Sequence, residues 1–310
     1  QWRALKDYAN KKGISIVGDI PIYVAFDSAD TWANPELFWL DEANVPIEVA
    51  GCPPDAFSAT GQLWGNPLYK WAYHEETGFA WWIRRLSHCF DIYDIVRIDH
   101  FRGFDEYWAI PYKDETAEHG MWKKGPGYKL FEAVKKTLGN REVIAEDLGF
   151  LTPSVLKLVK KTKFPGMKVL QFAFDAGGES DYLPHNYDNN CVVYTGTHDN
   201  DTVNGWIPSI SRKDLAFARK YLNVRRNSDL CESLIRTALG SVADTAVIPM
   251  QDYLGLGSEA RINTPSTLGG NWEWRMERGA CTEALSAHML ELAQLYGRTV
   301  RSGSGGNKNK

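Results

Sequence analysis

Short apolar runs rich in β-branched residues alternate along the chain with stretches of helical period. Continuous apolar runs of three to five residues are typical of parallel strands that are buried on both faces. Alternation of such strands with helices predicts an α/β fold with a parallel sheet. We predict strands at residues 14–17, 95–98, 143–145, 168–172, 191–195 and 246–250, and helices at 1–12, 127–138, 153–161, 211–221 and 231–240.

An acidic residue follows closely after five of these six strands. In a (β/α)₈ barrel the active site lies at the C-terminal ends of the strands, whereas a doubly wound sheet places it only at a switch point. Polar residues after nearly every strand therefore favour a TIM barrel. Because a barrel needs eight strands, we interpret the six as strands three to eight. The first two strands are expected upstream of Gln1, in a longer protein.

Residues 27–81 break the alternation, since they contain five prolines and many aromatic residues without a clear period. A loop of this length is improbable inside a barrel unless it is functional. We interpret it as an insertion after the third strand that folds over the barrel mouth. The expected division is barrel at 1–26, lid or insertion at 27–90, barrel strands four to eight with their helices at 91–298, and a disordered low-complexity tail at 299–310.

Charge and motif content exclude several classes of protein. The 310 residues carry 35 basic and 39 acidic side chains, which argues against binding to a phosphate backbone and favours a neutral substrate. No apolar run is long enough to predict a membrane span. Neither GxGxxG nor GxxxxGK[ST] occurs, so nucleotide chemistry lacks its main support. Five scattered cysteines without a CxxC spacing predict free thiols in a reducing compartment.

Aromatic residues make up 13% of the chain, with 12 Trp, 14 Tyr and 13 Phe. Aromatic faces stack on sugar rings as readily as they fill large cores, and composition alone leaves both readings open. Trp71, Trp81 and Trp82 are expected to pack in the core or between helices. Trp272 and Trp274 could point the same way from an extended segment and are left unassigned.

The segment Arg97-Ile98-Asp99-His100-Phe101-Arg102-Gly103 is the sharpest candidate for chemistry. A strand delivers Asp99 to its C-terminal end, and its period of two places Arg97 on the same face. The arginine would keep Asp99 ionised, as a carboxylate nucleophile requires. The alternative is a purely structural ion pair at a strand end.

Two further strand ends carry acidic groups. Glu146 follows the strand at 143–145, where partial desolvation by aromatic residues would raise its pKa and suit it to act as acid and then base. The alternative is a helix N-cap, which fits Asp147 better. His198 and Asp199 follow the strand at 191–195; His198 could instead bind a metal, but no second nearby histidine supports that.

Carboxylates from three strands that meet at one barrel mouth match retaining cleavage of a glycosidic bond. In that scheme one carboxylate attacks the anomeric carbon and a second protonates the leaving oxygen. The third could hold ring hydroxyls and favour a distorted sugar.

These segments together resemble the α-amylase clan, and two more narrow the resemblance to the amylomaltases, or 4-α-glucanotransferases. They are Gly18-Asp19-Ile20-Pro21-Ile22-Tyr23-Val24 and Pro53-Pro54-Asp55-Ala56-Phe57-Ser58, with Gly61-Gln62-Leu63-Trp64-Gly65-Asn66-Pro67 in support. The resemblance runs from about residue 1 to 298. It implies a full barrel of roughly 500 residues, in agreement with the strand count.

The resemblance also implies residue roles. Asp99 would be the nucleophile, Glu146 the general acid/base and Asp199 the carboxylate that stabilises the transition state. Substrate-binding roles would fall to Arg97 and His198 beside the −1 sugar, to Asp55, Gln62 and Trp64 in a mobile loop over the glucan, and to Asp19, Tyr23, Asn263 and Pro265 near the donor site. Neither a metal nor another cofactor is expected.

The loop would also favour transfer over hydrolysis, because a hydrophobic lid excludes water from the covalent intermediate. Phe57, Trp64 and Tyr69 flank Gly61 and Gly65, which could serve as hinges. The alternative is a rigid surface loop with buried aromatic residues.

The expected partners are α-1,4-glucan or maltooligosaccharide donors and acceptors, without nucleic acid or membrane, in the cytoplasm or alternatively in the plastid stroma. The alternative functions are an α-amylase-like hydrolase and an inactive or glucan-binding barrel fragment, whose open edges would be a hazard.

Overall fold

The computed structural model describes residues 1–54, 58–149, 151–175 and 178–299. The predicted tail at 299–310 therefore lies outside the described residues except for its first position, as do Asp55 and Phe57 of the predicted lid. The chain divides into two compact units, residues 1–167 and 168–310, which are described separately below.

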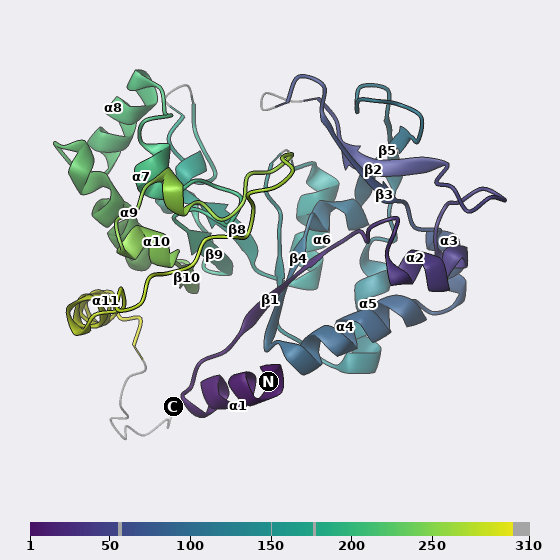
Figure 1. The fold of residues 1–310 in the computed structure, drawn as a ribbon, viewed down its shortest axis with the longest axis horizontal. Coiled ribbons are helices and arrows are strands. Elements are labelled where there is room, and N and C mark those ends of the chain that lie inside the picture. The colour runs from purple at the N-terminus through teal and green to yellow at the C-terminus, as the bar shows by residue number, and fades with distance from the viewer. Residues whose placement is uncertain (55–57, 150, 176–177, 300–310) are drawn as a thin grey trace, which may run out of the picture. The chain divides into compact units, whose positions relative to one another are not determined.

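The first unit holds a parallel three-stranded sheet and an antiparallel four-stranded sheet, in the orders β1-β4-β7 and β3-β2-β5-β6. Figure 1 shows the antiparallel strands gathered apart from β1 and β4. The strands are β1 (Val17–Pro21), β2 (Glu48–Cys52), β3 (Gln62–Pro67), β4 (Ile95–Asp99), β5 (Glu106–Pro111), β6 (Met121–Lys124) and β7 (Val143–Ala145). The helices are α1 (Trp2–Lys11), α2 (Ala29–Ala33), α3 (Trp71–Glu76), α4 (Ala80–Ile92), α5 (Tyr128–Leu138) and α6 (Pro153–Thr162).

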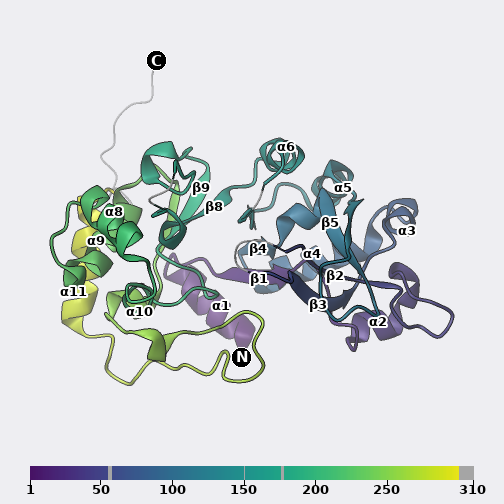
Figure 2. The same cartoon turned by 90° about the horizontal axis from the view of Figure 1, so that it is seen from above.

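The second unit contains a parallel three-stranded sheet in the order β10-β9-β8. Helices α9 and α11 pack against each other (Figure 2). Leu292 of α11 is fully buried. Its elements are β8 (Gly166–Val169), β9 (Cys191–Tyr194), α7 (Val203–Trp206), α8 (Arg212–Tyr221), α9 (Leu230–Gly240), β10 (Thr245–Val247), α10 (Met250–Tyr253) and α11 (Glu283–Leu295).

All six predicted parallel strands are present, but two predictions of their burial were wrong. The strand predicted at 14–17 begins instead at Val17, and its side chains alternate between exposed and buried. The last strand, predicted at 246–250, ends at Val247, and α10 begins at Met250. The side chains of this strand are exposed or only partly buried. Strands β7 and β9 are buried at every position, as predicted for strands covered on both faces.

Local capping chemistry fixes the helices that follow the strands. Thr152 caps α6, since its hydroxyl accepts a hydrogen bond from the main-chain N–H of Val155 ahead of Pro153 at the first helical position. The alternative reading of Glu146 or Asp147 as the cap of this helix is therefore wrong. Ser211 caps α8 in the same way by accepting from Asp214 N–H.

The segment at 27–81 contains α2, β2, β3 and α3 and is not structureless. Strand β2 pairs with β3 on one side and with β5 on the other, so part of this segment is completed by residues 106–111. Periodicity alone could not indicate this pairing, because the partner strand lies more than 50 residues further along the chain.

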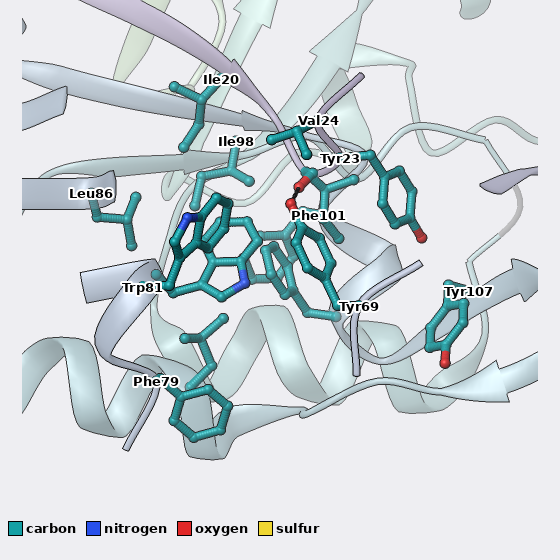
Figure 3. Packing of buried hydrophobic residues seen from close by; sticks show 14 of the residues in the cluster. Ile20, Tyr23, Val24, Tyr69, Phe79, Trp81, Leu86, Ile98, Phe101 and Tyr107 are labelled. Carbon is teal, nitrogen blue, oxygen red and sulfur yellow. Dashed lines mark hydrogen bonds between the residues drawn. The ribbon is translucent and has the colours of Figure 1, made fainter. Parts of the chain in front are cut away.

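Aromatic side chains fill the core of the first unit (Figure 3). Tyr69 is fully buried, and its ring lies 5.2 Å from that of Phe38 and 5.5 Å from that of Trp82, measured between centroids. Its hydroxyl donates to the carbonyl of Ile22 at 2.8 Å, so the polar end of the ring is satisfied. Trp81 and Trp82 are buried, which confirms their predicted core role.

Helix α1 keeps its predicted position, but its apolar face is exposed. Trp2, Leu5 and Tyr8 are 43%, 53% and 63% exposed. The indole N–H of Trp2 donates to the carbonyl of Ile92, which attaches the helix to the end of α4. Among the described residues, no helix combines the length and apolar character needed to cross a bilayer.

Candidate active site

Strand register brings together predicted residues of the neighbouring strands β1 and β4. Asp19 of β1 lies opposite Arg97 of β4, and Asp99 follows two positions after Arg97 on the same face. The Arg97 guanidinium donates to both carboxylate oxygens of Asp19, at 2.8 and 2.6 Å, and to Oδ1 of Asp99 at 2.9 Å. One arginine thus holds two carboxylates.

Arg97 is buried, whereas the side chains of Asp19 and Asp99 are each 41% exposed. Burial alone would lower the pKa of Arg97, but the charges of Asp19 and Asp99 raise it above its usual value. The guanidinium also donates through Nε to the Sδ of Met167, at 3.3 Å. The cation is therefore fixed on the inner side, and the two carboxylates keep access to solvent.

Glu146 follows β7, the strand that pairs with β4 on the other side. Its Oε2 accepts from the main-chain N–H of His100 at 2.7 Å, and its Oε1 accepts from that of Leu148 at 2.9 Å. Burial and the charge of Asp99 raise the pKa of Glu146 to about 7, although Arg97 and the two hydrogen bonds oppose the rise. Near neutral pH this half-buried carboxyl can both give and accept a proton.

His100 connects Glu146 to the aromatic residues of the site. Its backbone is left-handed, with φ of 52°, which is uncommon for a residue other than glycine. Its ring meets the indole of Trp64 edge-on, 4.8 Å between centroids, and lies 6.4 Å from the ring of Tyr23. Burial and the nearby Arg102 lower the pKa of His100 to about 3, so its imidazole is neutral.

Two predicted lid residues, Gln62 and Trp64, lie beside His100, because the indole of Trp64 contacts the His100 ring. The indole N–H of Trp64 donates to Oε1 of Gln62 at 3.1 Å, so the two side chains form one unit on β3. Tyr23 lies 6.3 Å from Trp64 and stacks on Tyr69 at 6.0 Å between ring centroids. The structure thus brings together Asp19, Tyr23, Gln62, Trp64, Arg97, Asp99 and Glu146, with His100 as a member that was not predicted.

His198, Asp199 and Asn263 form a cluster in the second unit. Oδ1 of Asp199 accepts from the side-chain amide of Asn263 at 2.6 Å, and Oδ2 lies 3.5 Å from Nε2 of His198. Arg261 donates to the main-chain carbonyls of both Asp199 and Asn263, each at 2.8 Å. Pro265 is exposed two residues after Asn263.

A small open pocket lies beside this cluster, lined among others by Thr197, His198, Gln251, Arg261 and Ile262. Trp272 lies at the same cluster, since its ring centroid is 5.1 Å from that of His198. Sequence reasoning left Trp272 unassigned; the signal was its place after Gly269-Gly270, a flexible pair that allows a sharp turn.

Within the described ranges, no group of three or more His, Cys, Asp or Glu side chains is arranged to hold a metal ion. The carboxylates described above instead accept hydrogen bonds from arginine, amide and main-chain N–H groups. Such hydrogen bonds hold carboxylates in fixed orientations.

Comparison with known proteins gives consistent matches. A family model described as 4-alpha-glucanotransferase matches residues 1–282. A 4-alpha-glucanotransferase of Clostridium butyricum is 52% identical over 300 residues, covering 96% of this chain and 62% of the relative. The chloroplastic/amyloplastic 4-alpha-glucanotransferase of Solanum tuberosum is 49% identical, covering 96% of this chain and 52% of the relative. The chain thus spans about half to three fifths of the length of these relatives.

Solved structures agree. The amylomaltase from Streptococcus agalactiae in complex with acarbose matches with a TM-score of 0.93 and 44% identity, covering 96% of this chain and 61% of that one. The amylomaltase from Corynebacterium glutamicum matches with a TM-score of 0.72 at 19% identity, covering 87% and 44%, which shows a shared fold.

Proposed function

Because the chain belongs to the 4-alpha-glucanotransferase family, we propose that it carries the nucleophile and the acid/base of a retaining transferase acting on α-1,4-glucans. The observation that carries the proposal is the hydrogen bond at 2.7 Å by which the main-chain N–H of His100, the residue after Asp99, holds the carboxyl of Glu146, whose pKa burial raises to about 7. A catalyst that must first donate and then remove a proton at neutral pH needs such a group.

In the proposed reaction Asp99 attacks the anomeric carbon of a donor glucan while Glu146 protonates the leaving glycosidic oxygen. The C1–O bond breaks and a β-glucosyl ester of Asp99 forms, with the first product released carrying the proton from Glu146. The ionised Glu146 then takes the proton of an acceptor 4-hydroxyl, whose oxygen attacks C1 and releases Asp99. Two inversions give net retention.

The other members of the group that includes Asp99 and Glu146 would orient the nucleophile or contact the substrate. Arg97 holds the Asp99 carboxylate in a fixed orientation, because its guanidinium is also bonded to Asp19. Gln62, Trp64 and Tyr23 would contact the glucan and exclude water from the ester, so that a sugar hydroxyl competes successfully for it. Asp55 is proposed for the same lid.

The second cluster would supply Asp199 as the carboxylate that stabilises the transition state, with His198 beside the −1 sugar and Asn263 and Pro265 along the donor site. This requires the parallel strands to belong to one (β/α)₈ barrel, with residues 27–90 inserted after its third strand, which we propose on the likeness to the amylomaltases. Donor and acceptor would both be α-1,4-glucans, in the cytoplasm or the plastid stroma.

The test is incubation with maltotriose. The chain is assayed alone and joined to the part of the C. butyricum relative that lies outside the matched region. We expect glucose and a ladder of longer maltooligosaccharides without an increase in reducing ends. A steady increase in reducing ends would favour an α-amylase-like hydrolase, and no turnover in either form would favour a glucan-binding or inactive protein.

Variants assign the roles. Asp99→Asn and Glu146→Gln should each reduce turnover by several orders of magnitude and leave the fold intact. The matched exposed controls Asp91→Asn and Glu132→Gln should keep normal turnover. Recovery of a Glu146→Ala variant by azide on an activated donor would support the acid/base role, whereas near-normal turnover of Asp99→Asn would contradict the nucleophile assignment.

A further inference from the structure

The loop that carries His198 and Asp199 connects the end of β9 to the start of α7. Its two ends are Thr195 and Val203, and both residues are fully buried. A buried hydroxyl and a buried main-chain N–H each need a hydrogen-bond partner, because leaving either unpaired is costly. The question is which group supplies these partners.

A single carboxylate, that of Asp252, supplies both. Its Oδ2 accepts from the hydroxyl of Thr195 at 2.5 Å, and its Oδ1 accepts from the main-chain N–H of Val203 at 2.8 Å. Asp252 belongs to α10 and is 3% exposed. One rigid planar group thus fixes the distance between the two ends of the loop.

Other bonds fix the middle of the loop. Gln171 donates to the carbonyl of Asp201 at 2.8 Å, and Oδ1 of Asn200 accepts from the N–H of Thr197 at 2.9 Å. Gln171 reaches the loop at one point, and the Asn200–Thr197 bond joins two residues inside it, so neither connects its two ends. Asp252 is different because its carboxylate bonds to both ends, 49 and 57 residues away along the chain.

Burial of a carboxylate is unfavourable, and burial raises the pKa of Asp252 above its ordinary range. An apolar side chain would fill the same space at lower cost to the fold, but it would leave the two buried donors unpaired. The side chain at position 252 therefore needs two polar atoms that can hydrogen-bond to the Thr195 hydroxyl and to the Val203 N–H. A side chain of the same volume without such atoms would not replace it.

We propose that Asp252 is a positioning residue, which holds both ends of the His198–Asp199 loop and so keeps the Asp199 carboxylate in place for the transition state. The inference rests on the proposed function for its catalytic consequence. A displacement of a catalytic group by about 1 Å can cost on the order of 100-fold in rate. Asp252 acts through Asp199 and the loop, so it should affect kcat more than KM.

Three variants test the proposal with maltotriose as substrate, each made in the chain joined to the part of the C. butyricum relative that lies outside the matched region. Asp252→Ala removes both acceptors, and we expect kcat to fall about 10- to 100-fold with KM little changed. Asp252→Asn can accept from Val203 through its oxygen and donate to Thr195 through its amide, so it should restore kcat to within about threefold. Leu234→Ala, at a fully buried position of α9, controls for a general loss of stability.

A double-mutant cycle separates positioning from simple destabilisation. In an Asp199→Ala background, Asp252→Ala should cause little further loss of kcat, because the group that it positions is already absent. Leu234→Ala should have the same effect in both backgrounds. The proposal would be overturned if Asp252→Ala lowered kcat equally in the wild-type and the Asp199→Ala backgrounds. It would also be overturned if Asp252→Ala and Leu234→Ala lowered kcat equally.

Hydrogen exchange decides the matter without an activity assay. In Asp252→Ala the amides of residues 197–203 should exchange at least tenfold faster, with those of α8 and α11 unchanged. Unchanged exchange in the loop would overturn the proposal even in an active enzyme. If the wild-type enzyme shows no glucan transfer, the proposed function fails, and faster exchange would still establish that Asp252 holds the loop.

Discussion

The main-chain N–H of His100 donates to Oε2 of Glu146 at 2.7 Å, which fastens the carboxyl after one strand to the residue that directly follows Asp99 on the neighbouring strand. The two carboxylates are therefore held by backbone as well as by side chains. Their separation depends on the β4–β7 register and the left-handed turn at His100. The charge of Asp99 is one of the causes that raise the pKa of Glu146.

This coupling predicts that Asp99→Asn lowers the pKa of Glu146. The negative charge of Asp99 is one of the causes that raise this pKa to about 7, so its neutralisation should bring the value down. Carboxyl ¹³C NMR of Glu146 in both proteins measures it directly. In the wild type, kcat/KM should fall above about pH 7 as the acid ionises. An unchanged Glu146 titration in Asp99→Asn would refute the coupling.

Glu146 also predicts a pH-dependent stability difference. Its folded pKa of about 7 exceeds the ordinary value of 4.5, so the folded state favours the protonated form. Stability from this group is complete below pH 4.5 and is lost as the pH rises through 7. Relative to the wild type, Glu146→Gln should therefore gain up to about 3 kcal/mol between pH 4.5 and 8. Urea denaturation of both proteins at pH 5 and pH 8 checks this, and a difference independent of pH would contradict it.

Arg97→Met should destabilise the first unit. The substitution keeps the aliphatic volume but leaves Asp19 and Asp99 without their shared cation. Because both carboxylates are partly exposed, we expect a loss of about 1–3 kcal/mol, below that of a fully buried pair. Arg226→Met, which removes an exposed pair with Asp229, serves as control and should cost under about 0.5 kcal/mol. Equal losses of unfolding free energy for Arg97→Met and Arg226→Met in chemical denaturation would contradict this prediction.

Two glycines in the predicted lid separate backbone strain from steric clash. Gly61 and Gly65 both have positive φ, 71° and 78°. An added Cβ at Gly61 would lie 2.5 Å from the carbonyl oxygen of Cys52, whereas at Gly65 it would meet nothing within 4 Å. Gly65→Ala should cost about 1 kcal/mol, and Gly61→Ala about 1–3 kcal/mol more. Thermal and urea unfolding measure both, and similar losses would show that the clash relaxes freely.

The sequence predicted the parts of the structure that follow local rules. The period of two correctly placed Arg97 beside Asp99, and buried runs identified β7 and β9. The second contact of Arg97, with Asp19, depends on the pairing of β1 with β4 and was not predicted. Desolvation was expected to raise the pKa of Glu146 and is the largest cause of the rise, whereas the second cause, the charge of Asp99, was not predicted.

Other features depend on backbone geometry that no residue pattern encodes. The turn at His100 has positive φ, which is uncommon outside glycine, so its N–H contact to Glu146 could not be foreseen. The antiparallel sheet was missed because β2 pairs with a strand far along the chain. The pairing of Asp199 with Asn263 likewise joins residues 64 positions apart.

The charge of Asp99 in the proposed reaction is not constant, and this gives the Asp99–Glu146 pair a timing function. When Asp99 becomes a glucosyl ester it loses its negative charge, while Arg97 remains neutralised by Asp19. One cause of the high proton affinity of Glu146 then disappears at the moment when it has just released its proton. Glu146 thus stays ionised until an acceptor arrives, and release of Asp99 resets its affinity for the next cycle. The formation and the breakdown of the ester on Asp99 would thus determine when Glu146 is ionised and when it is protonated.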